Sequence, residues 1–122
     1  MEERRKYVRV NKSFAVSYKP LGQFIKPSCT TKNISLGGIC LAIYHRLSPS
    51  TSIKMWITLR DFKNPIVATG TVLWIKDTGD PAFPWQVGIK FIEINPTDKR
   101  ILMEQIRIIC EEDKIPYVGP LD

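Results

Sequence analysis

The feature that most constrains the fold is a series of short segments in which apolar and polar residues alternate. Phe14, Val16 and Tyr18 alternate with small or polar residues, and strand-like segments follow at residues 25–34, 38–44, 53–60 and 66–76 and around 87–91. Alternation places successive side chains on opposite faces of a strand. Residues rich in Gly, Pro, Asp and Ser separate the segments. The sequence therefore predicts six strands joined by short connections.

A single helix is predicted after the last strand. Asn95 suits the N-cap, Pro96 the first helical position and Asp98 the positive end of the helix dipole. At about 100° per residue, one apolar stripe contains Leu102, Met103, Ile106, Ile109 and Cys110. The stripe is expected to pack on the open side of a barrel. Ile101 and Ile108 lie on a neighbouring flank, so either the helix is buried more broadly or that flank meets a partner.

Together these elements predict a mainly β fold, a six-stranded antiparallel barrel, closed or split, with a C-terminal α-helix. Residues 1–12 are polar and basic and are expected to form a flexible ligand-binding arm, anchored only by Tyr7, Val8 and Val10. The barrel and helix are expected to occupy residues 13–114, and residues 115–122 to form a tail.

A chain of 122 residues suffices for one domain with a real core. No segment approaches the roughly 18 consecutive apolar residues that span a bilayer, and no signal-like apolar region follows the charged start. We therefore expect a cytoplasmic protein without membrane insertion. The net charge of +6 favours an anionic partner. The basic residues that crowd the N-terminus are Arg4, Arg5, Lys6, Arg9 and Lys12.

Residues for catalysis or metal binding are scarce. Cys29, Cys40 and Cys110 are widely spaced and are expected to be small buried thiols rather than disulfide or zinc ligands. His45, the sole histidine, lies in a connector and is expected on the surface. One His and three scattered Cys provide no metal-ligand spacing, and no nucleotide-binding glycine loop occurs. The sequence therefore predicts a binding protein and not an enzyme, with neither a metal nor a cofactor.

Two segments carry groups suited to binding. Arg5 and Arg9 stand four residues apart, and guanidinium groups contact phosphates and the acceptor edge of guanine and stack on flat rings. The segment Asn33-Ile34-Ser35-Leu36-Gly37-Gly38 combines an amide, a hydroxyl and two glycines. Glycine adopts a left-handed φ at little cost, so the segment reads as a hairpin or bulge whose polar groups either stabilise the bend or face a ligand.

In combination, these segments resemble the PilZ domain, the bacterial receptor module for cyclic di-GMP. The R-x-x-x-R motif of that family matches Arg5-Lys6-Tyr7-Val8-Arg9, and its [D/N]-x-S-x-x-G motif matches the residues from Asn33 to Gly38. Gly88-Ile89-Lys90-Phe91, before the helix, also looks like the family. The resemblance covers essentially the whole chain and implies a six-stranded barrel with a C-terminal helix.

The resemblance also implies roles for individual residues in binding cyclic di-GMP. Arg5 and Arg9 would contact phosphate and the O6/N7 edge of guanine and stack on its rings. Asn33 would contact a guanine edge, and Ser35 would donate to phosphate or sugar oxygens. Gly37 and Gly38 would keep the surface clear. Many members have Asp at the position of Asn33, and an amide accepts less strongly from guanine than a carboxylate, so a lower affinity is expected.

Three further residues belong to the expected ligand-binding set. Arg4 precedes the R-x-x-x-R motif, where an arginine in relatives accompanies an intercalated ligand dimer, so one domain is expected to bind two cyclic di-GMP molecules. Gly88 enters the set through the motif of the last strand. Trp74 lies either beside the ligand on the outer wall or in the core or helix packing. The residues that share its strand parity are Ala68, Gly70 and Val72.

The expected mechanism is a disorder-to-order switch, in which the ligand bridges arm and barrel and thereby changes a surface for an unidentified downstream protein. Two alternatives remain. One is an interaction adaptor of the same fold without nucleotide affinity. The other is a small basic barrel that binds single-stranded nucleic acid, for which Trp56 with Lys54 and Arg60 is the only candidate face.

Overall fold

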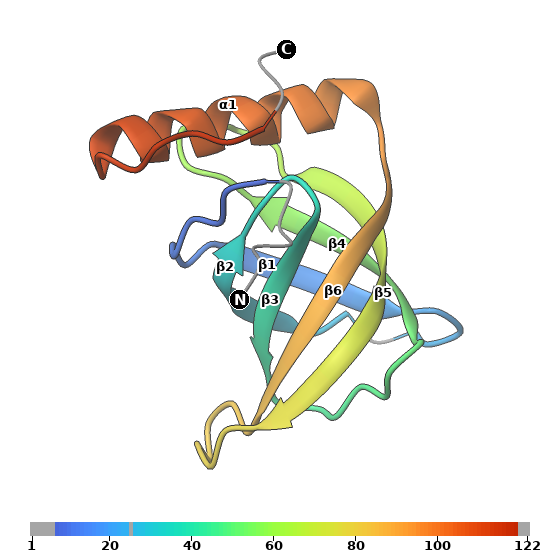
Figure 1. The fold of residues 1–122 in the computed structure, drawn as a ribbon. Helices are drawn as coiled ribbons and strands as arrows, with labels where there is room; N and C mark the ends of the chain where they lie inside the picture. The colour runs from blue at the N-terminus through green and yellow to red at the C-terminus, as the bar shows by residue number, and fades with distance from the viewer. Residues whose placement is uncertain (1–6, 25, 120–122) are drawn as a thin grey trace.

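The computed structural model describes residues 7–24 and 26–119. Six antiparallel strands close into a barrel in the order β1-β2-β3-β6-β5-β4 (Figure 1). Their bounds are β1 Ala15–Pro20, β2 Ser28–Ile34, β3 Gly38–Ile43, β4 Ser52–Thr58, β5 Ile66–Asp77 and β6 Trp85–Ile94. The predicted fold class is therefore confirmed, and the barrel is closed rather than split. The strand bounds differ mainly at β2, which starts after Pro27 and not at residue 25, and at β6, which extends beyond residues 87–91 at both ends.

Alternating side chains fill the barrel. Val16 and Tyr18 of β1 and Met55 and Ile57 of β4 are at most 2% exposed. These strands are direct neighbours, with Val16 opposite Ile57 and Tyr18 opposite Met55. Because inward residues recur every second position, the same strands leave the intervening side chains for the outer surface.

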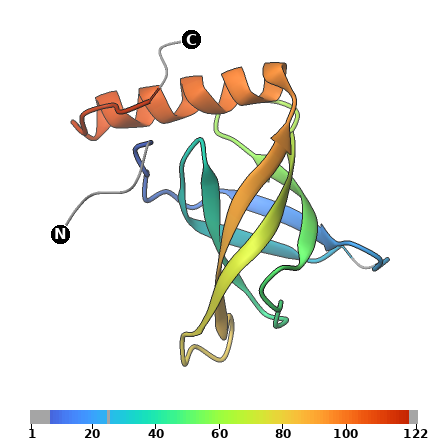
Figure 2. The same ribbon diagram turned by 45° about the vertical axis from the view of Figure 1, so that its right-hand side comes forward.

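The helix α1 (Pro96–Glu112) lies across one end of the barrel (Figures 1 and 2). Its N-cap is Asn95, whose Oδ1 accepts from the backbone N–H of Asp98 at 2.8 Å. The Asp98 carboxylate in turn accepts from the backbone N–H of Val67 at 3.0 Å, which connects the first helical turn to the start of β5. The predicted cap is confirmed, and the contact with β5 adds a second function for Asp98.

The predicted apolar stripe of α1 is buried against the barrel end. Gln105 is also buried, at 1% exposed, which the apolar pattern did not predict. Its Oε1 atom has no hydrogen-bond partner among the described residues. The flanking isoleucines differ, because Ile101 packs against the core whereas Ile108 is 37% exposed. No helix of the described chain is long and apolar enough to cross a membrane.

The strand pairing has three register shifts, and two of them are β-bulges that change which side chains of β2 and β5 face outward. Lys32 is the extra residue in β2, because Thr31 pairs with Leu41 but Asn33 already pairs with Cys40. Leu73 is the extra residue in β5, between the pairs Val72–Ile89 and Trp74–Gly88. A bulge turns the following residue to the other face of its strand. As a result Asn33 and Trp74 point outward although Thr31 and Val72 point into the barrel.

The segment before β1 is held on the barrel. Val10 is fully buried and exchanges two backbone hydrogen bonds with Ile34, at 3.0 and 3.1 Å. The backbone N–H of Val8 donates to the carbonyl of Val118 at 2.9 Å. The buried hydroxyl of Thr31 accepts from the N–H of Phe14 and donates to the carbonyl of Lys12. Of the three expected anchors, Tyr7, Val8 and Val10, the structure pairs Val10 with β2 as an isolated β-bridge and Val8 with the C-terminal segment.

Candidate functional site

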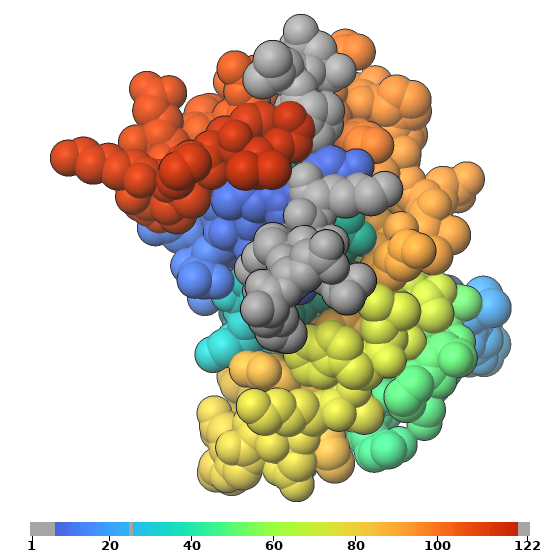
Figure 3. All heavy atoms as spheres, in the orientation of Figure 1, coloured from blue at the N-terminus to red at the C-terminus, as the bar shows by residue number. Residues whose placement is uncertain are grey.

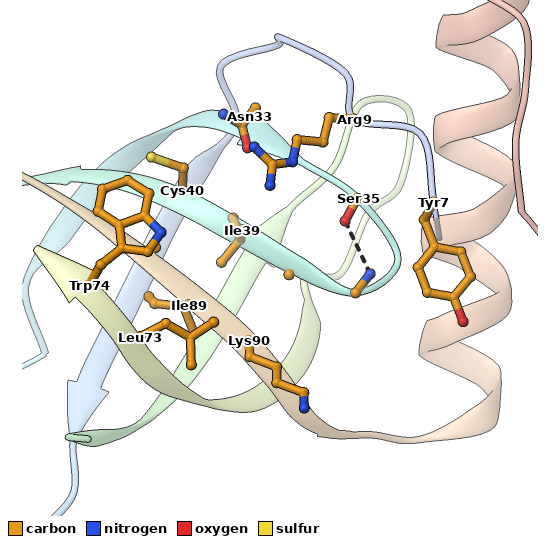
Figure 4. Close-up of a pocket in the computed structure, with 13 residues that line it drawn as sticks. Tyr7, Arg9, Asn33, Ser35, Ile39, Cys40, Leu73, Trp74, Ile89 and Lys90 are labelled. Atoms are coloured by element: carbon orange, nitrogen blue, oxygen red, sulfur yellow. Dashed lines mark hydrogen bonds between the residues drawn. The ribbon is translucent and has the colours of Figure 1, made fainter. Parts of the chain in front are cut away.

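A cleft of about 210 Å³ lies on the outer wall of the barrel, between the arm, the β2–β3 turn, β5 and β6 (Figure 4). The expected ligand-binding residues that line it are Arg9, Asn33, Ser35, Gly37, Gly38, Trp74 and Gly88. They come from segments far apart in the sequence, and the closed barrel brings them together. Arg4 and Arg5 lie outside the described residues.

Arg9 and Asn33 lie at one side of the cleft (Figure 4). The flanking backbone of Arg9 is fixed by the hydrogen bonds of Val8 and Val10. Asn33 reaches the cleft because the bulge at Lys32 turns it outward. Within residues 7–24 and 26–119, no acidic side chain forms an ion pair with Arg9 and none lines the cleft. This side of the cleft is therefore suited to an anion with hydrogen-bonding edges.

The turn between β2 and β3 is a tight hairpin. The N–H of Ser35 donates to the carbonyl of Gly38 at 2.9 Å, and the Ser35 hydroxyl accepts from the N–H of Gly37 at 3.1 Å. Neither glycine has a left-handed φ, so the turn does not use the conformational freedom that the sequence suggested. Gly38 is required for another reason, since a Cβ there would collide with the backbone carbonyl of Ile89.

The opposite wall of the cleft is the indole of Trp74. It covers Gly88, where a Cβ would overlap the indole ring, and remains 43% exposed. The sequence analysis placed Trp74 on the same face of its strand as Ala68, Gly70 and Val72, and this was wrong. Those three residues face the barrel interior, whereas the bulge at Leu73 turns Trp74 outward. Trp74 therefore lies on the outer wall of the barrel and not in the core or against the helix.

Several lining residues were not anticipated: Tyr7, Ile39, Cys40, Leu73, Ile89 and Lys90. Lys90 adds a second cation, and its alternation with Gly88 along β6 was the signal that could have identified it. Cys40 is 6% exposed. Burial raises the pKa of its thiol, and the nearby positive charges of Arg9 and Lys32 oppose that rise. The thiol is therefore neutral at ordinary pH, and the charge of the cleft comes from its cations.

The ring of Tyr7 lies between the cleft and the C-terminal segment. A Cβ on Gly37 would be 3.3 Å from Tyr7 Cδ2, and a Cβ on Gly119 would be 3.3 Å from Cδ1. In Figure 4 the ring lies at the far end of the β2–β3 turn from Trp74. Tyr7 therefore contacts both the turn that forms the cleft and the end of the described chain.

The histidine and the three cysteines are the residues that the sequence analysis considered for catalysis or metal binding. His45 is exposed, as expected, and its ring centroid lies 5.2 Å from that of Tyr44. Cys29, Cys40 and Cys110 are buried free thiols, as the sequence predicted. No group of three or more His, Cys, Asp or Glu in the described part of the chain could hold a metal ion.

A closed barrel with its cleft on the outer wall defines a small domain that presents a binding surface rather than an internal cavity. The chain belongs to the PilZ domain family, whose model matches residues 3–107. No match was found among curated protein sequences.

Solved structures share the fold. The PilZ domain of YcgR from Escherichia coli, solved with c-di-GMP, has a TM-score of 0.66 and 16% identity over 92% of this chain and 98% of its own. The inhibitor of motility MotI/DgrA from Bacillus subtilis has a TM-score of 0.74 and 21% identity over 93% of this chain. The MrkH–c-di-GMP complex from K. pneumonia has a TM-score of 0.73 and 16% identity over 93% of this chain. This chain spans about half the length of the latter two, at 53% and 55%.

Proposed function

We propose that this domain binds cyclic di-GMP in the outer-wall cleft. The observation that carries the proposal is the convergence of Arg9, Asn33, Ser35 and Trp74 on one cleft without an acidic lining residue. The family match supports it, as do the YcgR and MrkH structures, which contain c-di-GMP. The proposal extends to Arg4 and Arg5, which precede Arg9 on the arm.

The cleft offers a group for each part of such a ligand. Cyclic di-GMP has two phosphates and two guanines. The guanidinium of Arg9 supplies a charged fork for phosphate or for the O6/N7 edge, and the amide of Asn33 contacts a base edge. The Ser35 hydroxyl accepts from Gly37 N–H and keeps its own hydrogen for a ligand oxygen. The exposed indole of Trp74 provides a flat face beside the bases.

We further propose that the ligand acts on a partner protein through the arm. Tyr7 stands between Arg5 and Arg9 in the sequence, and its ring contacts Gly37 on one side and Gly119 on the other. Val8 is hydrogen-bonded to Val118. A ligand that draws both arginines onto the cleft would therefore change how the arm holds the C-terminal segment. The surface formed by these two segments is where we expect a partner to detect the bound state.

Calorimetric titration with cyclic di-GMP, with cyclic di-AMP as the control ligand, tests the binding proposal. Arg5→Ala, Arg9→Ala and Asn33→Ala should each weaken binding about ten- to a hundredfold, because each removes a charge-assisted or polar contact of about 1.5–3 kcal/mol. Arg100→Ala is the matched control, since this exposed arginine of α1 does not line the cleft. Equal binding of both ligands, or an equal effect of Arg100→Ala, contradicts the proposal.

The same titration tests the stoichiometry that Arg4 implies. Wild type should bind two cyclic di-GMP molecules per domain, and Arg4→Ala should move the value toward one. A stoichiometry near one in wild type would refute the intercalated dimer while leaving single-site binding intact.

The face considered for nucleic-acid binding, Trp56 with Lys54 and Arg60, is engaged within the protein, since Arg60 forms an ion pair with Glu112 at 2.8 Å. The Nζ of Lys26 lies 4.0 Å from the ring centroid of Trp56, and that of Lys54 lies 5.2 Å from it. Lysines therefore occupy the ring on which a base would stack. A domain that binds neither cyclic di-GMP nor an oligonucleotide would instead be an interaction adaptor of the same fold.

A further inference from the structure

The loop between β1 and β2 exposes two large apolar side chains. Leu21 is 82% exposed and Phe24 is 97% exposed, the highest values among the large hydrophobic residues described. The loop projects at the right-hand edge of the molecule in Figures 1 and 3, away from α1. We call Leu21 and Phe24 the loop tip. Side chains so poorly covered by their own protein mark a contact with an apolar partner or surface.

Three lysines lie beside the loop tip. Lys19 of β1 and Lys54 of β4 are exposed and directly opposite each other in the strand register, where like charges repel. Lys26, at the other end of the loop, places its ammonium over Trp56. No acidic residue of the described chain forms an ion pair with any of these lysines. We call Lys19, Lys26, Lys54 and Trp56 the basic band.

We infer that the loop tip and the basic band together dock on the surface of an anionic lipid bilayer. The apolar tip would enter the boundary of the acyl chains, and the flexible lysine side chains would place their ammonium groups at the level of the lipid phosphates. Trp56 is half-buried beside these ammonium groups, the environment that a tryptophan prefers at a membrane interface. Such docking lies on the surface and needs no membrane-spanning helix.

The shape and charge of this surface favour a bilayer over a protein partner. Leu21 and Phe24 stand on a projecting loop and, with Lys19 and Lys54, line a largely apolar hollow of about 390 Å³. An acyl chain has no fixed shape and fills such a hollow, whereas a protein partner would need a side chain of matching form. The charged residues of the band are all lysines, which act as mobile point charges rather than as bidentate forks. Repulsion between Lys19 and Lys54 is relieved when anions lie against both.

Docking in this way leaves the cleft accessible. The band lies on β1 and β4, which are neighbours in the barrel, whereas the cleft lies over β3 and β6 and extends to Asn33 of β2 and Trp74 of β5. In the strand order β1-β2-β3-β6-β5-β4 these two pairs are on opposite walls. The inference therefore does not depend on the proposed ligand.

Co-sedimentation with vesicles tests the inference directly. The full chain is mixed with vesicles of phosphatidylcholine alone or of equal parts phosphatidylcholine and phosphatidylglycerol, at low and high salt. Binding is expected only to the anionic vesicles and should weaken as salt increases. Phe24→Ser should weaken binding about tenfold, and Lys19→Gln, Lys26→Gln and Lys54→Gln about fivefold each.

Matched variants on other faces of the barrel distinguish docking by this surface from non-specific adsorption to vesicles. Ile92→Ser removes a 62% exposed apolar residue of β6, and Lys99→Gln removes an exposed lysine of α1. Neither should change vesicle binding, and circular dichroism should be the same for all variants. Absence of binding to anionic vesicles, equal binding to neutral ones, or an equal loss in the control variants would each overturn the inference.

Discussion

Two glycines beside the cleft are required for different reasons. At Gly38 a Cβ would meet the backbone carbonyl of Ile89, so the strands β3 and β6 approach too closely for any side chain. At Gly88 the three atoms nearest to a Cβ would all belong to the indole of Trp74, which is a movable side chain. Gly38 therefore supports the barrel, whereas Gly88 supports the position of one wall of the cleft.

This difference predicts that Gly38→Ala lowers mainly the stability of the fold, whereas Gly88→Ala weakens mainly ligand binding. Gly38→Ala should lower the free energy of unfolding by about 1–3 kcal/mol, because backbone must shift. Gly88→Ala should cost about 1 kcal/mol or less but displace Trp74 and weaken ligand binding. Urea denaturation and calorimetry measure the two effects. In a Trp74→Ala background, Gly88→Ala should have no further effect on binding, and an undiminished effect would contradict a role through the indole.

Among the elements, the arm connects the cleft to the rest of the molecule. Its backbone is hydrogen-bonded to the C-terminal segment through Val8 and Val118, and to β2 through Val10 and Ile34. Arg9, between them, faces the cleft. A ligand contact at Arg9 therefore acts on a segment that two other parts of the chain already hold.

Amide hydrogen exchange on the arm tests the ordering mechanism. The N–H groups of Val8 and Val10 already have acceptors within the protein, so saturation with cyclic di-GMP should protect mainly the remaining amides of residues 4–12. Protection of Val118 and Gly119 should change in parallel if Tyr7 transmits the effect. Unchanged exchange over residues 4–12 at saturation would exclude an ordering switch.

The elements of the fold followed closely from the sequence, whereas the shape of the cleft did not. Alternation predicted the strands because the barrel interior accepts only apolar side chains, and Asn95-Pro96 predicted the start of α1. The bulges at Lys32 and Leu73 left no mark in the pattern, since a bulge depends on the register of the partner strand. The placement of Trp74 and the contribution of Cys40 follow from those bulges and from pairing across the barrel, so strand parity could not supply them.

At the scale of the whole molecule, the barrel keeps the cleft, the basic band and α1 on different sides. α1 covers one end, and the cleft and the basic band occupy opposite walls. The interior has no charged side chain among the described core residues, but it contains groups that can lose a proton, among them Tyr18 and Cys29. Burial raises the pKa of the Tyr18 phenol from 10.0 to about 12 and that of the Cys29 thiol from 9.0 to about 12.

These two groups predict a loss of stability at alkaline pH. The unfolded chain releases the protons near pH 9 and 10, whereas the folded barrel retains them to about pH 12. The stabilisation is complete below pH 9 and is lost as the pH rises toward 12, because the unfolded state then binds fewer protons. Urea denaturation across this range measures it. Cys29→Ala should make the decline shallower, and a free energy of unfolding that stays constant up to about pH 12 would contradict the expectation.

The bulges also bear on how such a domain changes over evolutionary time. Each is a single extra residue, and the strand continues in register on both sides of it. At each bulge two successive side chains, Lys32 with Asn33 and Leu73 with Trp74, point outward where a regular strand places one. One inserted codon therefore adds a side chain to the outer wall while the buried side chains on either side of it keep their places. Barrels of this kind can diverge in the surface that they present while their core stays the same.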